Sequence, residues 1–321
     1  MKRVRPRKER RRAAGRLILF TLLFFLLLPY LGSLMGDGGQ EEIRSANYIS
    51  DTWVEVDRLW GKERIPLEEY LVGMMAATIP VDYERETLKA QAIMLRSWCY
   101  SLAKKEKGYD IIPGNELEEA YLSPTACQKI WKESNEENCA LIKEILEETK
   151  GMVLVWQGQI AAPPFFRISS GMTRTVGEYQ AHAKRWAYVC SCPCPQDVEA
   201  KEYLGRAELS RREFEKKVSR LLGEEKWTLD KIILHRDLAD YVKTVEIGGK
   251  KIQGEEFRYA LGLNSSCFTL EKQDDTIVIK TRGMGHGFGF SQYQANELAK
   301  QGQTYRQLLE TFFSEITIEK L

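Results

Sequence analysis

A glycine-rich segment near the C-terminus constrains the fold of this chain more than any other part of its sequence. Residues 282–292 read Arg-Gly-Met-Gly-His-Gly-Phe-Gly-Phe-Ser-Gln, with glycine at every second position from 283 to 289. Because side chains alternate between the two faces of a strand, an extended segment would place the glycines on one face and His286 on the other. A face without side chains lets a ligand or another segment approach the backbone closely.

A helix is predicted directly after this segment. Ser291 stands three residues before Gln294, which is the spacing of a capping box, and Gly302 is placed to stop a helix that runs to about Lys300. We therefore expect a strand, an imidazole and a helix N-terminus side by side. The alternative is a glycine-rich turn around a structural histidine.

The first 35 residues differ sharply from the rest of the chain. Residues 1–16 contain nine Lys or Arg and a single Glu, and residues 17–35 contain no charge and are rich in Leu and Phe. About 19 apolar residues suffice to cross the hydrocarbon layer of a membrane. The end of such a segment that is flanked by Lys and Arg stays on the cytoplasmic side. We predict a cytoplasmic tail at 1–16, a transmembrane anchor at 17–35, a polar linker at 36–50 and an extracytoplasmic domain at 51–321. A cleaved signal peptide is the alternative.

The remainder of the chain is mildly acidic. Beyond residue 16 it carries 38 basic and 45 acidic side chains, a net charge of about −7, which argues against a nucleic-acid-binding surface. A hydrophobic content of 43% allows a large buried core.

Hydrophobic periodicity predicts an α+β fold, with a helical N-terminal half packed on a mostly antiparallel sheet and one transmembrane helix before it. Pro66 and an apolar stripe predict a helix from residue 67 that ends before Pro80. The other expected elements are a helix at 85–102, mainly helical structure at 103–150, paired strands at 152–166, a helical stretch at 199–222 and hairpins at 241–281.

Three of the seven cysteines form a cluster. Cys190, Cys192 and Cys194 are spaced as C-x-C-x-C, with His182 eight residues upstream of the first. Structural zinc sites usually have two-residue spacers, so zinc is only a weak hypothesis here and no cofactor is assigned. Cys99 lies on an apolar helical stripe and is predicted to be a buried thiol.

Six sequence blocks occur in an order that resembles one known family. They are residues 67–77, 86–96, 148–154, 169–173, 257–263 and 285–293. Over roughly residues 60–321 the chain resembles the stage II sporulation protein D and amidase-enhancer family of bacterial cell-wall proteins. The resemblance implies a membrane protein of sporulation that acts on peptidoglycan glycan strands stripped of stem peptides, beside an amidase and a membrane partner of the engulfment machinery.

The resemblance also implies a lytic transglycosylase reaction. That reaction needs a carboxylic acid that protonates the departing glycosidic oxygen and then acts as base toward the MurNAc 6-hydroxyl, which closes a 1,6-anhydro ring. In the family a glutamate stands between an Ala-Ala pair and a proline, and here that position is Thr78. An aliphatic hydroxyl cannot deliver a proton near neutral pH, so catalysis is expected to be impaired or lost.

Two nearby glutamates could substitute for the missing acid. Glu84 and Glu86 follow Pro80 closely, although Glu86 is also placed to stabilise the N-terminus of the next helix. Phe166 is a second departure, because the resemblance implies a histidine there.

Other polar side chains in the matching blocks suit a glycan groove. The predicted sugar-binding residues are Gln91, Arg96, Ser169, Ser170, Thr173, His286, Ser291 and Gln292. Some of them have a structural alternative: Arg96 can pair with a helix carboxylate, the serines can stabilise turns, and His286 can be a satisfied core histidine.

Three function hypotheses remain open at this point. The first is a membrane-anchored transglycosylase that uses Glu84 or Glu86, and the second is a glycan-binding scaffold or amidase activator. The third is an extracytoplasmic structural protein without affinity for sugar.

Overall fold

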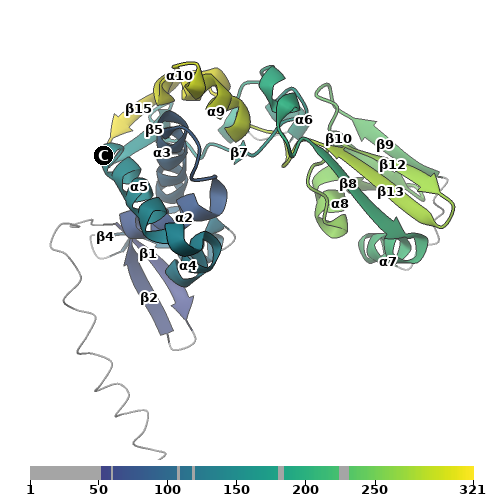
Figure 1. Ribbon diagram of the computed structural model, residues 1–321, viewed down its shortest axis with the longest axis horizontal. Coiled ribbons are helices and arrows are strands. Elements are labelled where there is room, and N and C mark those ends of the chain that lie inside the picture. Colours follow the sequence, from purple (N-terminus) through teal and green to yellow (C-terminus); the bar gives the residue numbers. More distant parts are fainter. Residues whose placement is uncertain (1–51, 59–60, 107–108, 118–119, 180–183, 224–230) are drawn as a thin grey trace, which may run out of the picture. The chain divides into compact units, whose positions relative to one another are not determined.

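The fold is α+β, as the sequence predicts, but the expected single sheet is divided into several small, mostly antiparallel sheets, and the N-terminal half contains a four-stranded sheet as well as helices (Figure 1). The computed structural model describes residues 52–58, 61–106, 109–117, 120–179, 184–223 and 231–321. Within these ranges no helix is both long enough and apolar enough to cross a bilayer. The predicted tail, anchor and linker at 1–16, 17–35 and 36–50 lie outside the described residues, so they stay predictions.

Two helices form the centre of the N-terminal half. α2 (Leu67–Thr78) follows Pro66, which occupies the N-cap position, and it buries the predicted apolar stripe. α3 (Arg85–Leu102) has the predicted bounds, and Cys99 is completely buried in it, which raises the pKa of its thiol. α3 packs against α2, against α5 (Asn135–Glu148) and against α10 (Tyr305–Phe312).

The prediction of mainly helical structure at 103–150 is wrong for its first part. β3 (Lys104–Glu106) and β4 (Tyr109–Pro113) join β1 (Thr52–Arg58) and β2 (Gly61–Pro66) in one sheet. β4 pairs in parallel with β1 and buries its two isoleucines, so tertiary pairing outweighs the charged composition. The helical part begins later, with a 3₁₀ turn at Gly114–Glu116, α4 (Pro124–Trp131), a turn at Lys132–Ser134 and α5.

The predicted strands after residue 151 are present. β5 (Met152–Trp156) pairs with β6 (Gln159–Ile160) and with the C-terminal strand β15 (Ile316–Lys320). β7 (Phe165–Phe166) instead pairs in parallel with β14 (Phe290–Ser291), which precedes α9 (Gln292–Lys300). Among the described residues that follow β7, short helical segments occur at α6 (Val176–Tyr179), Lys184–Trp186 and Pro195–Glu199.

The remaining strands form two three-stranded sheets. The first has the order β11 (Lys250–Gln253), β10 (Val242–Ile247), β9 (Ile232–Arg236), and the second has the order β12 (Phe268–Gln273), β13 (Thr276–Arg282), β8 (Leu204–Ser210). The predicted hairpins are therefore confirmed. α7 (Arg211–Leu222) and α8 (Gly254–Leu261) pack beside these strands, and the predicted helical stretch at 199–222 is helical only from Arg211 because β8 occupies its middle (Figure 1).

The glycine-rich segment is not the continuous strand that its alternation predicts. β13 ends at Arg282, the first residue of the segment, and β14 covers only Phe290 and Ser291. Positive φ angles of 75°, 115°, 73° and 90° occur at Gly283, Gly285, Gly287 and Gly289. These angles lie outside the strand region of backbone conformation. The glycines are therefore required for a path that turns repeatedly between neighbouring segments.

The predicted capping box at the start of α9 is also absent. Ser291 is the N-cap residue, but its side chain makes no capping hydrogen bond and donates instead to Asp197 at 2.7 Å. The Gln294 side chain pairs with Gln196. α9 still begins at Gln292 and ends before Gly302, so the helix itself is confirmed.

Gly287→Ala is expected to be much more destabilising than Gly262→Ala. The two glycines have similar φ angles, 73° and 71°, so a Cβ costs about 1–2 kcal/mol in each through backbone strain. A Cβ at Gly287 would also overlap the buried Tyr241 ring, whereas a Cβ at Gly262 meets no atom within 4 Å. Urea unfolding should show an additional loss of about 1–3 kcal/mol for Gly287→Ala. Equal losses in the two variants would contradict this account.

Candidate functional site

The end of α2, the middle of α3 and the start of α9 meet in a cluster of amide and hydroxyl groups. Gln292 Nε2 donates to the Thr78 carbonyl at 2.8 Å and to Gln91 Oε1 at 3.2 Å. Gln91 Nε2 donates to Thr78 Oγ1 at 3.3 Å, and Thr78 Oγ1 donates to the Met74 carbonyl at 2.8 Å. Gln91 and Gln292 are buried and Thr78 is half-buried. The glycine-rich segment and the tip of the first helix therefore meet, through Gln292.

Neither of the two candidate substitute acids bonds to this cluster. Glu86 accepts from Lys89 Nζ at 2.8 Å and from the Tyr305 backbone N–H at 2.8 Å. Glu84 is the N-cap residue of α3 and its side chain is exposed. Across the described part of the chain, no carboxylate forms a hydrogen bond with Thr78, Gln91 or Gln292.

His286 lies in a separate aromatic environment. Its Nδ1 accepts from the Phe288 N–H at 3.1 Å, and its ring lies 5.5 Å from the Phe166 ring and 5.3 Å from the Tyr179 ring. The pKa of the His286 imidazole is lowered to about 4, mainly by burial, so the ring is neutral near pH 7. No hydrogen bond or ring contact joins it to Thr78 among the residues described.

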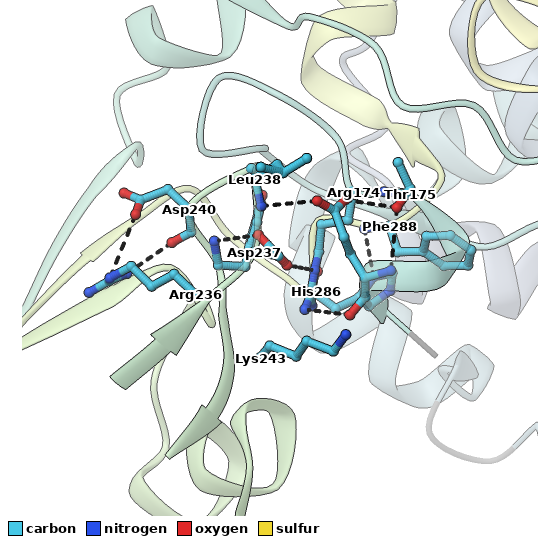
Figure 2. A network of polar contacts seen from close by, with 12 residues as sticks. Arg174, Thr175, Arg236, Asp237, Leu238, Asp240, Lys243, His286 and Phe288 are labelled. Atoms are coloured by element: carbon cyan, nitrogen blue, oxygen red, sulfur yellow. Dashed lines mark hydrogen bonds and ion pairs between the residues drawn. The ribbon is translucent and has the colours of Figure 1, made fainter. Parts of the chain in front are cut away.

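Arg174 fixes the path of the glycine-rich segment, and the sequence analysis did not single it out. Its Nε donates to Asp237 Oδ2 at 2.6 Å and its NH1 group to the His286 carbonyl at 3.2 Å (Figure 2). Its backbone N–H donates to the Gly287 carbonyl at 2.8 Å. Only 3% of the Arg174 side chain and 1% of the Asp237 side chain are exposed, so this is a buried ion pair. The only sequence signal for Arg174 is its place at the end of the Ser-Ser-Gly-Met-Thr block.

The hydroxyl groups of that block bond inward. Ser169 Oγ accepts from the Gly171 N–H at 3.1 Å, and Ser170 Oγ donates to the Ala239 carbonyl at 2.9 Å. Thr173 Oγ1 donates to the Cys190 carbonyl at 3.3 Å. These contacts correspond to the structural alternative, in which the hydroxyls stabilise turns.

A second residue that the sequence analysis missed is Asp197. It is completely buried, and its Oδ2 accepts from the Ser169 N–H and from Ser291 Oγ, each at 2.7 Å. Burial raises its pKa to about 6, against the opposing effect of these hydrogen bonds. Asp197 therefore joins the serine loop to the start of α9. A single aspartate in a polar loop gives no sequence signal for this role.

Asp197 and His286 should make opposite contributions to the pH dependence of stability. The pKa of Asp197 is raised from 3.8 to about 6, so its contribution to stability is lost as pH rises through that window. The pKa of His286 is lowered from 6.5 to about 4, so its contribution is lost as pH falls through nearly the same window. In the wild-type protein the two effects largely cancel.

Single variants should expose each contribution. As the pH increases from 4 to 6.5, the free energy of unfolding of Asp197→Asn should rise by roughly 3 kcal/mol more than that of wild type. Over the same range the free energy of unfolding of His286→Gln should fall by a similar amount relative to wild type. Urea unfolding at several pH values measures both slopes. Parallel profiles for wild type and both variants would contradict the two pKa shifts.

Arg96 has a structural set of partners. Its Nε and NH2 groups donate to the two carboxylate oxygens of Glu68 at 2.7 and 2.8 Å. Its remaining donors reach the carbonyls of Leu146, Thr149 and Met152. The side chain has no exposed area. The ion pair with a helix carboxylate, which was the structural alternative, is thus present.

The cysteine cluster lies beside Thr173. Cys190 and Cys192 are half-buried, and Cys194 is buried. The hydrogen bond with Cys192, together with burial, raises the pKa of the Cys194 thiol. The described ranges contain no group of three or more His, Cys, Asp or Glu that could hold a metal ion, and His182 lies outside them. Zinc at His182, Cys190, Cys192 and Cys194 therefore stays an untested prediction.

Comparison with known proteins supports the resemblance found in the sequence. The family described as "Stage II sporulation protein" matches residues 56–156. Two relatives named Stage II sporulation protein D are 31% identical over 264 residues, from Bacillus amyloliquefaciens, and 30% identical over 263 residues, from Bacillus subtilis (strain 168). Each alignment covers 80% of this chain, and 75% and 76% of the respective relative. An uncharacterized protein of Brachyspira hyodysenteriae is 22% identical over 275 residues.

Proposed function

Because this chain belongs to the stage II sporulation protein D family, we propose that it is a membrane-anchored sporulation protein that binds peptidoglycan glycan strands and cleaves them poorly or not at all. The observation that carries the proposal is the cluster of Thr78, Gln91 and Gln292, which contains amide and hydroxyl groups but no carboxylate partner.

The chemistry of this cluster suits binding better than turnover. Amide and hydroxyl groups both donate and accept hydrogen bonds, as sugar hydroxyls do. Cleavage in addition needs a group whose pKa lies near the operating pH, and neither a primary amide nor a threonine hydroxyl meets that need. Gln91 and Gln292 are buried, so a ligand would meet this cluster through the half-buried Thr78.

The contacts of the nearby glutamates support the same proposal. Both oxygens of Glu86 are occupied, by Lys89 and by the N-terminal N–H of α10, which favours a role in joining α3 to α10. The Glu84 backbone N–H is held by Asn296 at 2.7 Å, while its side chain is exposed. For either glutamate to act as the acid, its side chain would have to reach the Thr78 cluster from these positions.

The cellular setting is part of the proposal. The uncharged segment at 17–35 supports a single membrane anchor, with the N-terminus in the cytoplasm and the main domain outside it. Family membership supports a role beside a cell-wall amidase during engulfment, which produces the peptide-free strands that this domain would bind.

A binding and cleavage assay on the full-length, detergent-solubilised protein tests this function. Peptide-free glycan strands should bind saturably, and mass spectrometry should find no 1,6-anhydro-MurNAc ends after prolonged incubation. Formation of anhydro ends would overturn the inactive assignment, and their loss in Glu84→Gln or Glu86→Gln would identify the acid. A protein that neither binds strands nor changes the rate of a partner amidase would overturn the binding proposal.

A further inference from the structure

Cys192 and Cys194 form a pair of neighbouring thiols that the proposed function does not use. Both are free cysteines, and their side chains are hydrogen-bonded to each other. The Cys194 thiol also donates to the Cys192 carbonyl at 3.7 Å, so its sulfur is folded back toward the earlier cysteine. The fold therefore brings the two sulfur atoms together across a single intervening residue.

Backbone hydrogen bonds hold this pair against the serine block. The Thr173 N–H donates to the Cys192 carbonyl at 3.0 Å, and the Cys192 N–H donates to Thr173 Oγ1 at 2.9 Å. The Cys194 N–H donates to the Gly171 carbonyl at 2.9 Å. Pro193, between the two cysteines, has its φ angle fixed by its ring. Because the backbone is anchored at both cysteines, the thiols stay close to each other in the folded protein.

The third cysteine of the segment does not share this contact. The Cys190 thiol donates to the Tyr188 carbonyl at 3.9 Å, and the Cys190 N–H donates to the Phe312 carbonyl at 2.9 Å. Within the described part of the chain, no hydrogen bond joins the Cys190 sulfur to that of Cys192 or Cys194. Cys190 is therefore an internal reference for the reactivity of the other two.

The two paired thiols differ in exposure. Cys192 is half-buried, whereas Cys194 is buried. A reagent in solution therefore reaches Cys192 first, and Cys194 lies behind it as the thiol that can react next with the Cys192 sulfur. This order of access is the one that thiol–disulfide exchange needs.

We propose that Cys192 and Cys194 form a reversible disulfide by exchange with an external disulfide. The Cys192 thiolate attacks one sulfur of that disulfide, and the first thiol leaves. The Cys194 thiolate then attacks the Cys192 sulfur of the mixed disulfide, and the second thiol leaves. Two protons pass from the cysteines to the two released thiols, so the cysteines lose two electrons and the external disulfide gains them.

This bond is suited to a switch and not to a structural crosslink. It closes a very short loop, so it removes little entropy from the unfolded chain and stabilises the fold only slightly. Its formation replaces the contact of Cys192 Sγ with Thr173 Oγ1 at 3.6 Å, so oxidation acts directly on the serine block. The proposed extracytoplasmic position is one in which disulfides persist. The inference does not depend on glycan binding.

The test follows the three thiols of the full-length protein in neutral detergent. The protein is equilibrated in mixtures of reduced and oxidised glutathione and quenched with acid, and its free thiols are trapped with N-ethylmaleimide. Trypsin then releases the peptide of residues 186–201, which contains all three cysteines, for mass spectrometry. The matched variants are Cys190→Ser, Cys192→Ser and Cys194→Ser, and each removes one thiol of the same segment.

In oxidising mixtures the wild-type peptide should have maleimide on Cys190 alone, and in reducing mixtures on all three cysteines. Cys190→Ser should keep the oxidisable pair, whereas Cys192→Ser and Cys194→Ser should lose it. The equilibrium constant for oxidation should be about tenfold larger in the folded protein than in concentrated urea, because the fold holds the thiols together. A bond that includes Cys190, equal constants in the folded and unfolded protein, or thiols that stay reduced in every mixture would each overturn the proposal. Bound zinc that keeps the three thiols reduced would also overturn it.

Discussion

Thr78→Glu should give the protein measurable cleavage of peptide-free glycan strands, with 1,6-anhydro-MurNAc ends as the product. The substitution places a carboxylic acid at the tip of α2, where the resemblance to the family locates the catalytic group. A positioned general acid and base typically accelerates a reaction by about 10²–10⁴-fold, so the change should be visible above a background near zero.

The surroundings of position 78 are suited to receive this carboxylate. Gln91 Nε2 lies 3.3 Å from Thr78 Oγ1, so an amide donor stands close to position 78. Thr78 is half-buried, so a longer side chain can extend toward solvent without filling a closed core. The fold should therefore tolerate the substitution.

Thr78→Gln is the matched control, because glutamine has the size of glutamate without its titratable proton. Mass spectrometry of the products from both variants, at several pH values, separates acid chemistry from a change in shape. If Thr78→Glu binds strands as tightly as wild type but releases no anhydro ends, the missing acid is not what prevents turnover.

Arg96→Met should lower the free energy of unfolding by about 3–5 kcal/mol, the cost of leaving one partner of a buried ion pair unpaired. The Arg96 side chain has no exposed area and that of Glu68 is only 11% exposed, so water cannot replace the lost partner. Three backbone carbonyls, at residues 146, 149 and 152, would also lose their donor.

Arg85→Met is the matched control for this loss. Arg85 is on the same helix and pairs with Glu144 and Glu148, but its side chain is 43% exposed. Exposed pairs contribute about 0–1 kcal/mol, so urea unfolding should show only a small change. The double variant Glu68→Gln with Arg96→Met should be more stable than Arg96→Met alone, because it removes the unpaired charge. Equal losses for Arg85→Met and Arg96→Met would show that the pair is not structurally important.

The elements that sequence predicted well depend on neighbours close along the chain. The bounds of α3, the buried stripe of α2 and the hairpin of β12 and β13 all follow from hydrophobic periodicity within a few residues. The strand β4 was missed because its partner, β1, lies 58 residues earlier and pairs with it in parallel. A charged stretch with weak periodicity does not reveal a pairing of that kind.

The candidate site was predicted in its composition but not in its geometry. Thr78, Gln91 and Gln292 were each singled out, and they do meet. The glycines have positive φ angles instead of strand geometry, and the His286 ring lies between those of Phe166 and Tyr179. A period of two in the glycines is compatible with a strand and with a series of turns, and only the surrounding contacts distinguish them.

The sequence by itself determined the family of the chain, its α+β class and its main helices and hairpins, and it places a threonine at position 78, where the resemblance implies an acid. These depend on residue identity and on local spacing. Only the tertiary structure decided that Gln292 reaches Thr78 across 214 residues, that the Ser291 hydroxyl donates to Asp197 instead of capping α9, and that Arg96 turns inward to Glu68. Such choices depend on which buried polar groups find a partner once the core has packed, and no local pattern specifies that partner.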